Sequence, residues 1–200
     1  MNTPNKLTLL RMMLVPVVMA FTLWEGFSHH YLVAGLLFLA AAITDILDGK
    51  IARRYGLVTN FGKLMDPVAD KLLVCASLIC FVRLDVCSAW ILFVVLAREF
   101  LVTSVRLVAA GDGKVIAANA WGKWKTVSQS VAVVTVYVFL YFQELVGLSV
   151  IPQGPVTEFL NASLLSALGS GFLWISAVLT LISGAVYIGD NRGVFSEKES

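Results

Sequence analysis

Apolar segments long enough to cross a membrane recur along the whole chain of 200 residues. A helix needs about 20 apolar residues to span the hydrocarbon. Segments of that kind lie near residues 7–25, 31–48, 67–84, 89–110, 125–147 and 163–188. Hydrophobic residues make up 58% of the chain and charged residues only 14%, which is more apolar than a soluble domain of this size can bury. No Pro/Gly/Ser-rich linker separates the segments, so we predict one all-α membrane domain over residues 1–200 with six transmembrane helices.

Lysine and arginine are distributed unequally between the two sets of connections. The loops near 26–30, 85–88 and 148–162 carry none, whereas the N-terminus and the linkers 49–66 and 111–125 carry several. The positive-inside rule therefore predicts that both termini and both basic linkers face the cytoplasm. We expect a multi-pass protein of the cell inner (cytoplasmic) membrane, with a mitochondrial membrane as the alternative.

Two pairs of aspartates flank the first basic linker. Asp45 and Asp48 are three residues apart, and Asp66 and Asp70 are four apart, so each pair shares one face of a helix. An ionised residue at the centre of a membrane helix costs roughly 2.5–3.5 kcal/mol and usually marks a functional site. Carboxylates without a nearby His or thiolate select hard cations such as Mg²⁺ or Mn²⁺. The short linker predicts that both pairs form one metal site facing the cytoplasm.

A structural role for these aspartates is the alternative. Asp66 precedes Pro67, which is a good N-cap arrangement, and the first pair could form ion pairs with Arg53 or Arg54. Four acids at these spacings, with glycines beside both pairs, exceed what capping requires.

The complete pattern resembles the signature of the CDP-alcohol phosphotransferase family. It reads Asp45-x2-Asp48-Gly49-x2-Ala52-Arg53-x8-Gly62-x3-Asp66-x3-Asp70, and it matches every fixed position of that signature. The resemblance implies a homodimeric membrane enzyme with six helices. Such an enzyme transfers a phosphatidyl or similar group from a CDP-linked donor to an alcohol and releases CMP at a dinuclear Mg²⁺ or Mn²⁺ site.

The same resemblance assigns roles position by position. It makes four carboxylates the metal ligands: Asp45, Asp48, Asp66 and Asp70. Asp70 would also be the base that takes the proton from the attacking hydroxyl. Gly49, Ala52 and Arg53 would hold the cytidine diphosphate of the donor.

A second set of charges bears on the acceptor alcohol. Four cations lie in or beside the fourth and fifth apolar segments: Arg98, Arg106, Lys123 and Lys125. A phosphate group with nearly two negative charges needs several such donors in a poorly solvated site, whereas an uncharged alcohol does not. In the alternative interpretation, Arg98 pairs with Glu99 or Asp85 and the lysines are ordinary cytoplasmic charges.

The segments 5–11, 64–71, 97–106 and 121–126 are similar to those of the bacterial branch of the family that uses glycerol 3-phosphate. This resemblance covers roughly residues 4–130. It implies that the phosphatidyl group passes from CDP-diacylglycerol to sn-glycerol 3-phosphate and that the four cations bind the acceptor phosphate. The last two apolar segments match only in hydropathy and are candidates for a lipid-tail groove or the dimer face.

Another acceptor, ion transport and nucleic-acid binding are the alternatives to this function. Within the family, inositol phosphate is the alternative acceptor. A divalent-cation transporter would spread its acids through the membrane midplane, whereas these cluster at one end of the predicted helices. The net charge of +2, without a basic run interleaved with aromatics, argues against a nucleic-acid partner.

Overall fold

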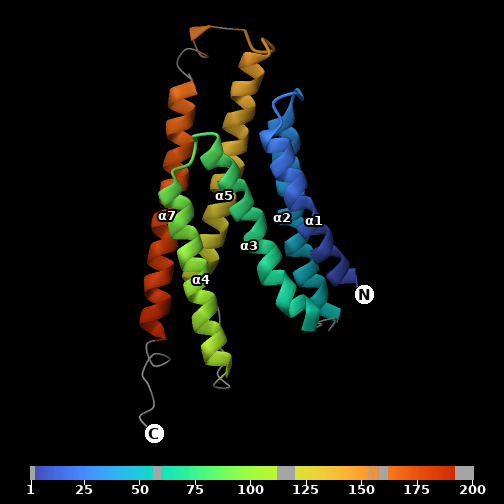
Figure 1. Cartoon of the computed structure of the whole chain (residues 1–200), viewed down its shortest axis with the longest axis vertical. Helices are drawn as coiled ribbons and strands as arrows, with labels where there is room; N and C mark the ends of the chain where they lie inside the picture. The colour runs from blue at the N-terminus through green and yellow to red at the C-terminus, as the bar shows by residue number, and fades with distance from the viewer. Residues whose placement is uncertain are drawn as a thin grey trace.

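The chain forms an elongated bundle of helices (Figure 1). The computed structural model describes residues 3–55, 60–111, 120–152, 154–155, 157 and 162–191. Its side-chain descriptions lie within residues 5–45, 65, 68–69, 71–109, 121–152, 154–155, 157 and 164–191. The helices are α1 (Thr3–Leu23), α2 (His30–Tyr55), α3 (Asn60–Arg83), α4 (Ala89–Gly111), α5 (Ala120–Gly147) and α7 (Ala162–Asp190). The described residues contain no strand, which confirms the predicted all-α class.

Several helices are longer than the apolar segments that predict them. α2 continues to Tyr55 instead of ending near residue 48, and α3 begins at Asn60. Asp66 therefore lies inside α3, and the alternative that it caps the start of this helix is wrong. The reason is that hydropathy marks only the apolar part of a helix, whereas good helix formers continue it into polar surroundings.

Three of the described helices are long and apolar enough to cross a membrane: Asn5–Leu23, Trp121–Gly147 and Leu164–Asp190. α2 contributes a shorter apolar helix, His30–Asp45. α4 is also apolar but carries three charged residues within its length, Arg98, Glu99 and Arg106, and it is not one of these spans. Six crossings and cytoplasmic termini thus stay predictions.

The ends of the helices that carry the sequence motifs lie together. α1 packs against α2 and α3, while α7 packs against α4 and α5. The last turns of α2 and α4 and the first turns of α3 and α5 lie at the end of the bundle where α1 begins and α7 ends (Figure 1). The aspartate segments and the cationic segments are therefore at the same end.

The buried side chain of Tyr137 connects several helices away from the motif segments. A Cβ added at Gly35 would lie 3.2 Å from the Cβ of Tyr137, so α2 and α5 approach closely there. The Tyr137 hydroxyl lies 3.0 Å from Thr22 Oγ1 and 3.4 Å from Ser77 Oγ. Small residues and internally satisfied polar groups are what helix packing in lipid requires.

Candidate functional site

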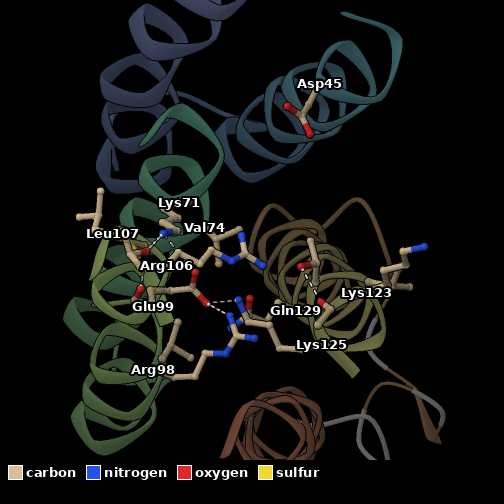
Figure 2. A pocket seen from close by; sticks show the side chains of 16 residues that line it. Asp45, Lys71, Val74, Arg98, Glu99, Arg106, Leu107, Lys123, Lys125 and Gln129 are labelled. Carbon is tan, nitrogen blue, oxygen red and sulfur yellow. Dashed lines mark hydrogen bonds and ion pairs between the residues drawn. The ribbon is translucent and has the colours of Figure 1, made fainter. Parts of the chain in front are cut away.

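A cavity of about 830 Å³ opens between α3, α4 and α5, with Asp45 of α2 at its edge (Figure 2). Its volume is in the range of small-molecule sites. The charged residues among its described lining are Asp45, Lys71, Arg98, Glu99, Arg106, Lys123 and Lys125. Among the lining residues whose side chains the structure describes, five cations face two carboxylates, so this part of the cavity suits an anion.

Glu99 is the centre of the charge cluster in this cavity. Its Oε1 accepts a hydrogen bond from Arg98 Nη1 at 3.1 Å and also contacts Lys125 Nζ, while Oε2 lies 3.7 Å from Lys71 Nζ. Glu99 is 9% exposed and Lys125 is 5% exposed, so water screens this pair weakly. One carboxylate therefore connects α3, α4 and α5.

The four predicted acceptor cations occupy different positions around the cavity. Arg98 and Lys125 belong to the buried cluster, whereas Arg106 and Lys123 are exposed. Lys123 extends away from Glu99 (Figure 2). The alternative pairing of Arg98 with Glu99 is present, and it lies in the wall of the cavity itself.

Lys71 is a cavity residue that the sequence analysis did not assign. It follows Asp70 directly, donates a hydrogen bond to Thr103 Oγ1 and approaches the Glu99 carboxylate. Its position next to a motif aspartate was the available signal. Lys71 links the second half of the aspartate motif to the cationic cluster.

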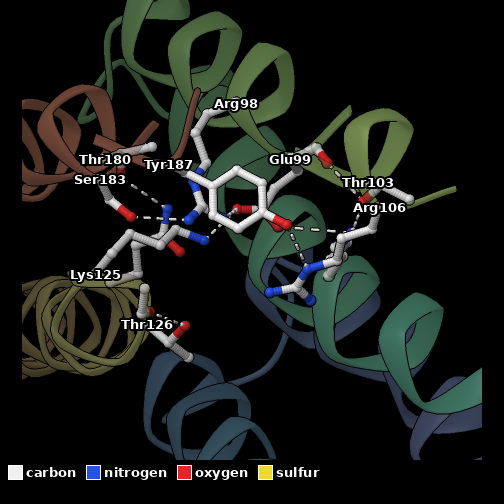
Figure 3. A network of polar contacts seen from close by, with 12 residues as sticks. Arg98, Glu99, Thr103, Arg106, Lys125, Thr126, Thr180, Ser183 and Tyr187 are labelled. Atoms are coloured by element: carbon white, nitrogen blue, oxygen red, sulfur yellow. Dashed lines mark hydrogen bonds and ion pairs between the residues drawn. The ribbon is translucent and has the colours of Figure 1, made fainter. Parts of the chain in front are cut away.

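α7 contributes polar groups that hydropathy alone did not indicate. Ser183 Oγ accepts a hydrogen bond from Arg98 Nη2 at 2.8 Å, and the Tyr187 hydroxyl accepts one from Arg106 Nε at 3.2 Å (Figure 3). Between α5 and α7, Gln129 Nε2 donates to Thr180 Oγ1 at 3.3 Å. The helical spacing of these α7 residues was a readable signal in the sequence.

Asp45 is the motif aspartate whose side chain the structure describes. Its carboxylate pairs with Arg11 of α1, which is 1% exposed, and it also borders the cavity. Arg11 is thus a partner that the sequence analysis did not name, while the side chains of the predicted partners Arg53 and Arg54 lie outside the described residues. The sequence places Arg11 among the cytoplasmic charges and within the similar segment 5–11, but it does not predict a contact with Asp45.

The other motif residues are placed by their helices alone. α2 carries Asp48, Gly49, Ala52 and Arg53, and α3 carries Asp66 and Asp70, but their side chains lie outside the described residues. Among the residues that the structure describes, no group of three or more His, Cys, Asp or Glu side chains forms a cation site. The metal and nucleotide assignments therefore stay predictions. A donor set made only of carboxylates fits Mg²⁺ or Mn²⁺.

Comparison with known proteins decides the family. Residues 1–182 match the model of the family described as CDP-alcohol phosphatidyltransferase. The chain belongs to this family. The resemblance drawn from the aspartate motif is thereby confirmed.

Relatives of this CDP-alcohol phosphatidyltransferase match it over nearly its whole length. A Bacillus subtilis (strain 168) protein named CDP-diacylglycerol–glycerol-3-phosphate 3-phosphatidyltransferase is 40% identical over 201 residues, covering 95% of each chain. A Rickettsia felis protein of the same name is 36% identical over 187 residues, covering 93% of each chain. A Mycobacterium tuberculosis protein named probable phosphatidylglycerophosphate synthase is 37% identical over 191 residues, covering 94% of this chain and 80% of its own.

Proposed function

We propose that the chain transfers the phosphatidyl group of CDP-diacylglycerol to the terminal hydroxyl of sn-glycerol 3-phosphate, giving phosphatidylglycerophosphate and CMP. One observation carries this proposal: a single cavity is lined by Asp45 of the aspartate motif and by the cations Arg98, Arg106 and Lys125. Relatives at 36–40% identity are named for the same reaction, which supports it.

The cationic side of the cavity would bind the acceptor. Glu99 neutralises part of the charge of Arg98, Lys125 and Lys71, and these described residues together keep an excess of positive charge that would attract an anion. A phosphate dianion supplies the missing charge and several hydrogen-bond acceptors. Lys123 would contribute from the exposed edge. An acceptor without a phosphate would leave this charge unused.

The aspartate side of the cavity would bind the donor. Asp45, Asp48, Asp66 and Asp70 would hold two Mg²⁺ or Mn²⁺ ions, which when bound neutralise the diphosphate and stabilise the leaving CMP. The small residues Gly49 and Ala52 would let the cytidine diphosphate lie against α2, where Arg53 would meet its phosphate oxygens.

The reaction itself is a direct displacement. The acceptor hydroxyl oxygen forms a bond to the phosphorus of the phosphatidyl group while the bond from that phosphorus to CMP breaks. Asp70 would take the proton of the hydroxyl. The acyl chains of donor and product would stay in the bilayer, entering between helices. We further propose six crossings, a cytoplasmic active site in the inner membrane, and a homodimer.

The test is CMP release by the purified protein in detergent with CDP-diacylglycerol and Mg²⁺. Release that depends on glycerol 3-phosphate, and that stops on chelation of the metal or in Asp70→Asn, is the expected result. Release with inositol phosphate in place of glycerol 3-phosphate would keep the chemistry but overturn the acceptor. Failure with both acceptors would overturn the proposed reaction.

A further inference from the structure

One face of α7 is polar although the helix is otherwise among the most apolar in the chain. The four polar residues of this face are Ser176, Thr180, Ser183 and Tyr187. They follow one another at intervals of four, three and four residues, so they share one face of the helix. All four are 4% exposed or less. Polar groups inside a membrane helix are costly unless they are paired, so such a face indicates a specific role.

Two residues of this face bind the two arginines of the cavity. Ser183 Oγ lies 2.8 Å from Arg98 Nη2, and the Tyr187 hydroxyl lies 3.2 Å from Arg106 Nε. The Arg106 guanidinium carbon also lies 5.6 Å from the centre of the Tyr187 ring, within the range of a cation–π contact. Figure 3 shows both α7 side chains directed at the arginines of α4.

These contacts leave the phosphate-binding atoms of Arg106 available. A guanidinium group has five N–H donors, and a phosphate is bound best by two parallel bonds. Tyr187 occupies Nε of Arg106, so both Nη groups remain free of this bond. Arg106 is exposed at the cavity, whereas Tyr187 is almost fully buried and therefore fixed in place.

Arg98 is held along its length by the same helix. Its Nη2 donates to Ser183 and its Nη1 donates to Glu99, and each nitrogen keeps one further N–H. A Cβ added at Gly184 would lie 3.1 Å from Arg98 Cγ, so the backbone of α7 packs directly against the aliphatic part of the side chain. A change of the Arg98 rotamer would therefore disturb its contacts with Ser183 and Gly184 of α7.

We propose that Ser183 and Tyr187 are positioning residues for the acceptor phosphate and that α7 supports the two arginines that line the acceptor site. They act through Arg98 and Arg106 and need not touch the substrate. This inference rests on the proposed function, because it names glycerol 3-phosphate as the anion that the two arginines bind. It gives the last helix a role that its hydropathy did not assign.

The test compares Tyr187→Phe and Ser183→Ala in the full-length protein with the wild type. Each variant removes one hydrogen bond to an arginine and keeps its charge. We expect the KM for glycerol 3-phosphate to rise roughly threefold to tenfold, the range for loss of one such bond. The kcat and the KM for CDP-diacylglycerol should stay within about twofold, because the bonds serve only one substrate. Tyr187→Leu, which also removes the ring, should raise the acceptor KM further.

Matched controls exist in the polar group around Tyr137. Tyr137→Phe and Ser77→Ala make the same chemical changes at buried positions that do not line the cavity. Both should leave the acceptor KM unchanged. Thermal melting of all variants in detergent reports whether they fold alike.

Two results would contradict the inference, and a third would contradict the proposed function on which it rests. An unchanged acceptor KM in both α7 variants would refute positioning. Equal losses for both substrates, shared by the controls, would show a general effect on folding instead. Both of these results require an active wild type. A wild type that releases no CMP with glycerol 3-phosphate would instead contradict the proposed function, and the inference would lose its basis with it.

Discussion

Glu99 of α4 and Lys125 of α5 form a buried ion pair at the wall of the cavity. The same carboxylate also lies within 3.1 Å of Arg98 and 3.7 Å of Lys71. The side chains that the structure describes in this cluster thus carry one negative charge and three positive ones. A buried charge imbalance of this kind is costly unless an anion completes it, so the stability of the bundle and the binding of the acceptor should be linked.

Replacing Glu99 with Gln should expose this linkage. The change removes the negative charge that Glu99 supplies to three neighbouring cations, which we expect to cost about 3 kcal/mol, at the lower end for a broken buried pair. Thermal melting in detergent should therefore occur several degrees lower. Added glycerol 3-phosphate should raise the melting temperature of Glu99→Gln more than that of the wild type, since the phosphate replaces the lost charge.

The control for this prediction is Glu144→Gln. Glu144 of α5 is also held between helices, accepting a hydrogen bond from the His30 backbone N–H at 3.1 Å, but it lies outside the cavity. Its variant should respond to glycerol 3-phosphate as the wild type does. Equal responses of Glu99→Gln and the wild type would contradict the link between the cluster and the acceptor.

Arg98 should tolerate neither loss of its charge nor loss of its shape. Arg98→Ala removes the charge-assisted bonds to a phosphate, worth roughly 1.5–3 kcal/mol, so the acceptor KM should rise about 10-fold to 100-fold. Arg98→Lys keeps the charge but cannot reach both Glu99 and Ser183, so an increase of about tenfold is expected. Steady-state kinetics with varied glycerol 3-phosphate provides the measurement.

Arg83→Ala is the matched control, because Arg83 is an exposed cation in the last turn of α3 and does not line the cavity. It should leave both KM values unchanged. If Arg98→Lys behaved as the wild type, the argument from guanidinium geometry would be wrong.

The sequence predicted the helices better than it predicted their side-chain contacts. Apolar segments located the helices because lipid-facing and core-facing residues are both apolar, so hydropathy is strong along each helix. The same uniformity concealed which face of α7 is buried. Ser183 and Tyr187 stand out only when polar residues are read at helical spacing.

The contacts of Asp45 and Glu99 show a second limit. Chain spacing predicted partners that are close in the sequence, and Arg98 does pair with its neighbour Glu99. The pairs Arg11–Asp45 and Glu99–Lys125 instead join residues that are 34 and 26 positions apart. Such pairs depend on how helices pack, which local patterns do not specify. The family resemblance nevertheless predicted that residues of α2, α3, α4 and α5 would serve one reaction.

Gly184→Ala should weaken acceptor binding without touching a polar atom. The added methyl would lie 3.1 Å from Arg98 Cγ, so the side chain must move by a few tenths of an ångström. We expect the KM for glycerol 3-phosphate to rise severalfold with kcat nearly unchanged. Gly171→Ala, on the same helix with nothing within 4 Å, has the same gain in helix propensity and should leave the KM as it is. Identical kinetics of the two variants would contradict close packing of α7 on Arg98.

The membrane orientation predicts which introduced cysteines react from outside the cell. Ser28 is exposed in the connection between α1 and α2, on the side predicted to face outward, and Lys6 is exposed at the predicted cytoplasmic end of α1. In cells whose wall has been removed and whose cytoplasmic membrane is intact, a membrane-impermeant maleimide should label Ser28→Cys. It should label Lys6→Cys only after the membrane is opened.

The native protein supplies its own control in Cys87, which lies between α3 and α4 on the same predicted outer side. Burial raises the pKa of the Cys87 thiol to about 12. The reactive thiolate is therefore scarce at pH 7–8, and the buried sulfur is hard to reach. The wild type should thus stay unlabelled from outside, so that a signal from Ser28→Cys reports the introduced residue. Labelling of Lys6→Cys in intact cells would show that the orientation is the reverse of the predicted one. The cationic cavity would then face outward, away from cytoplasmic glycerol 3-phosphate.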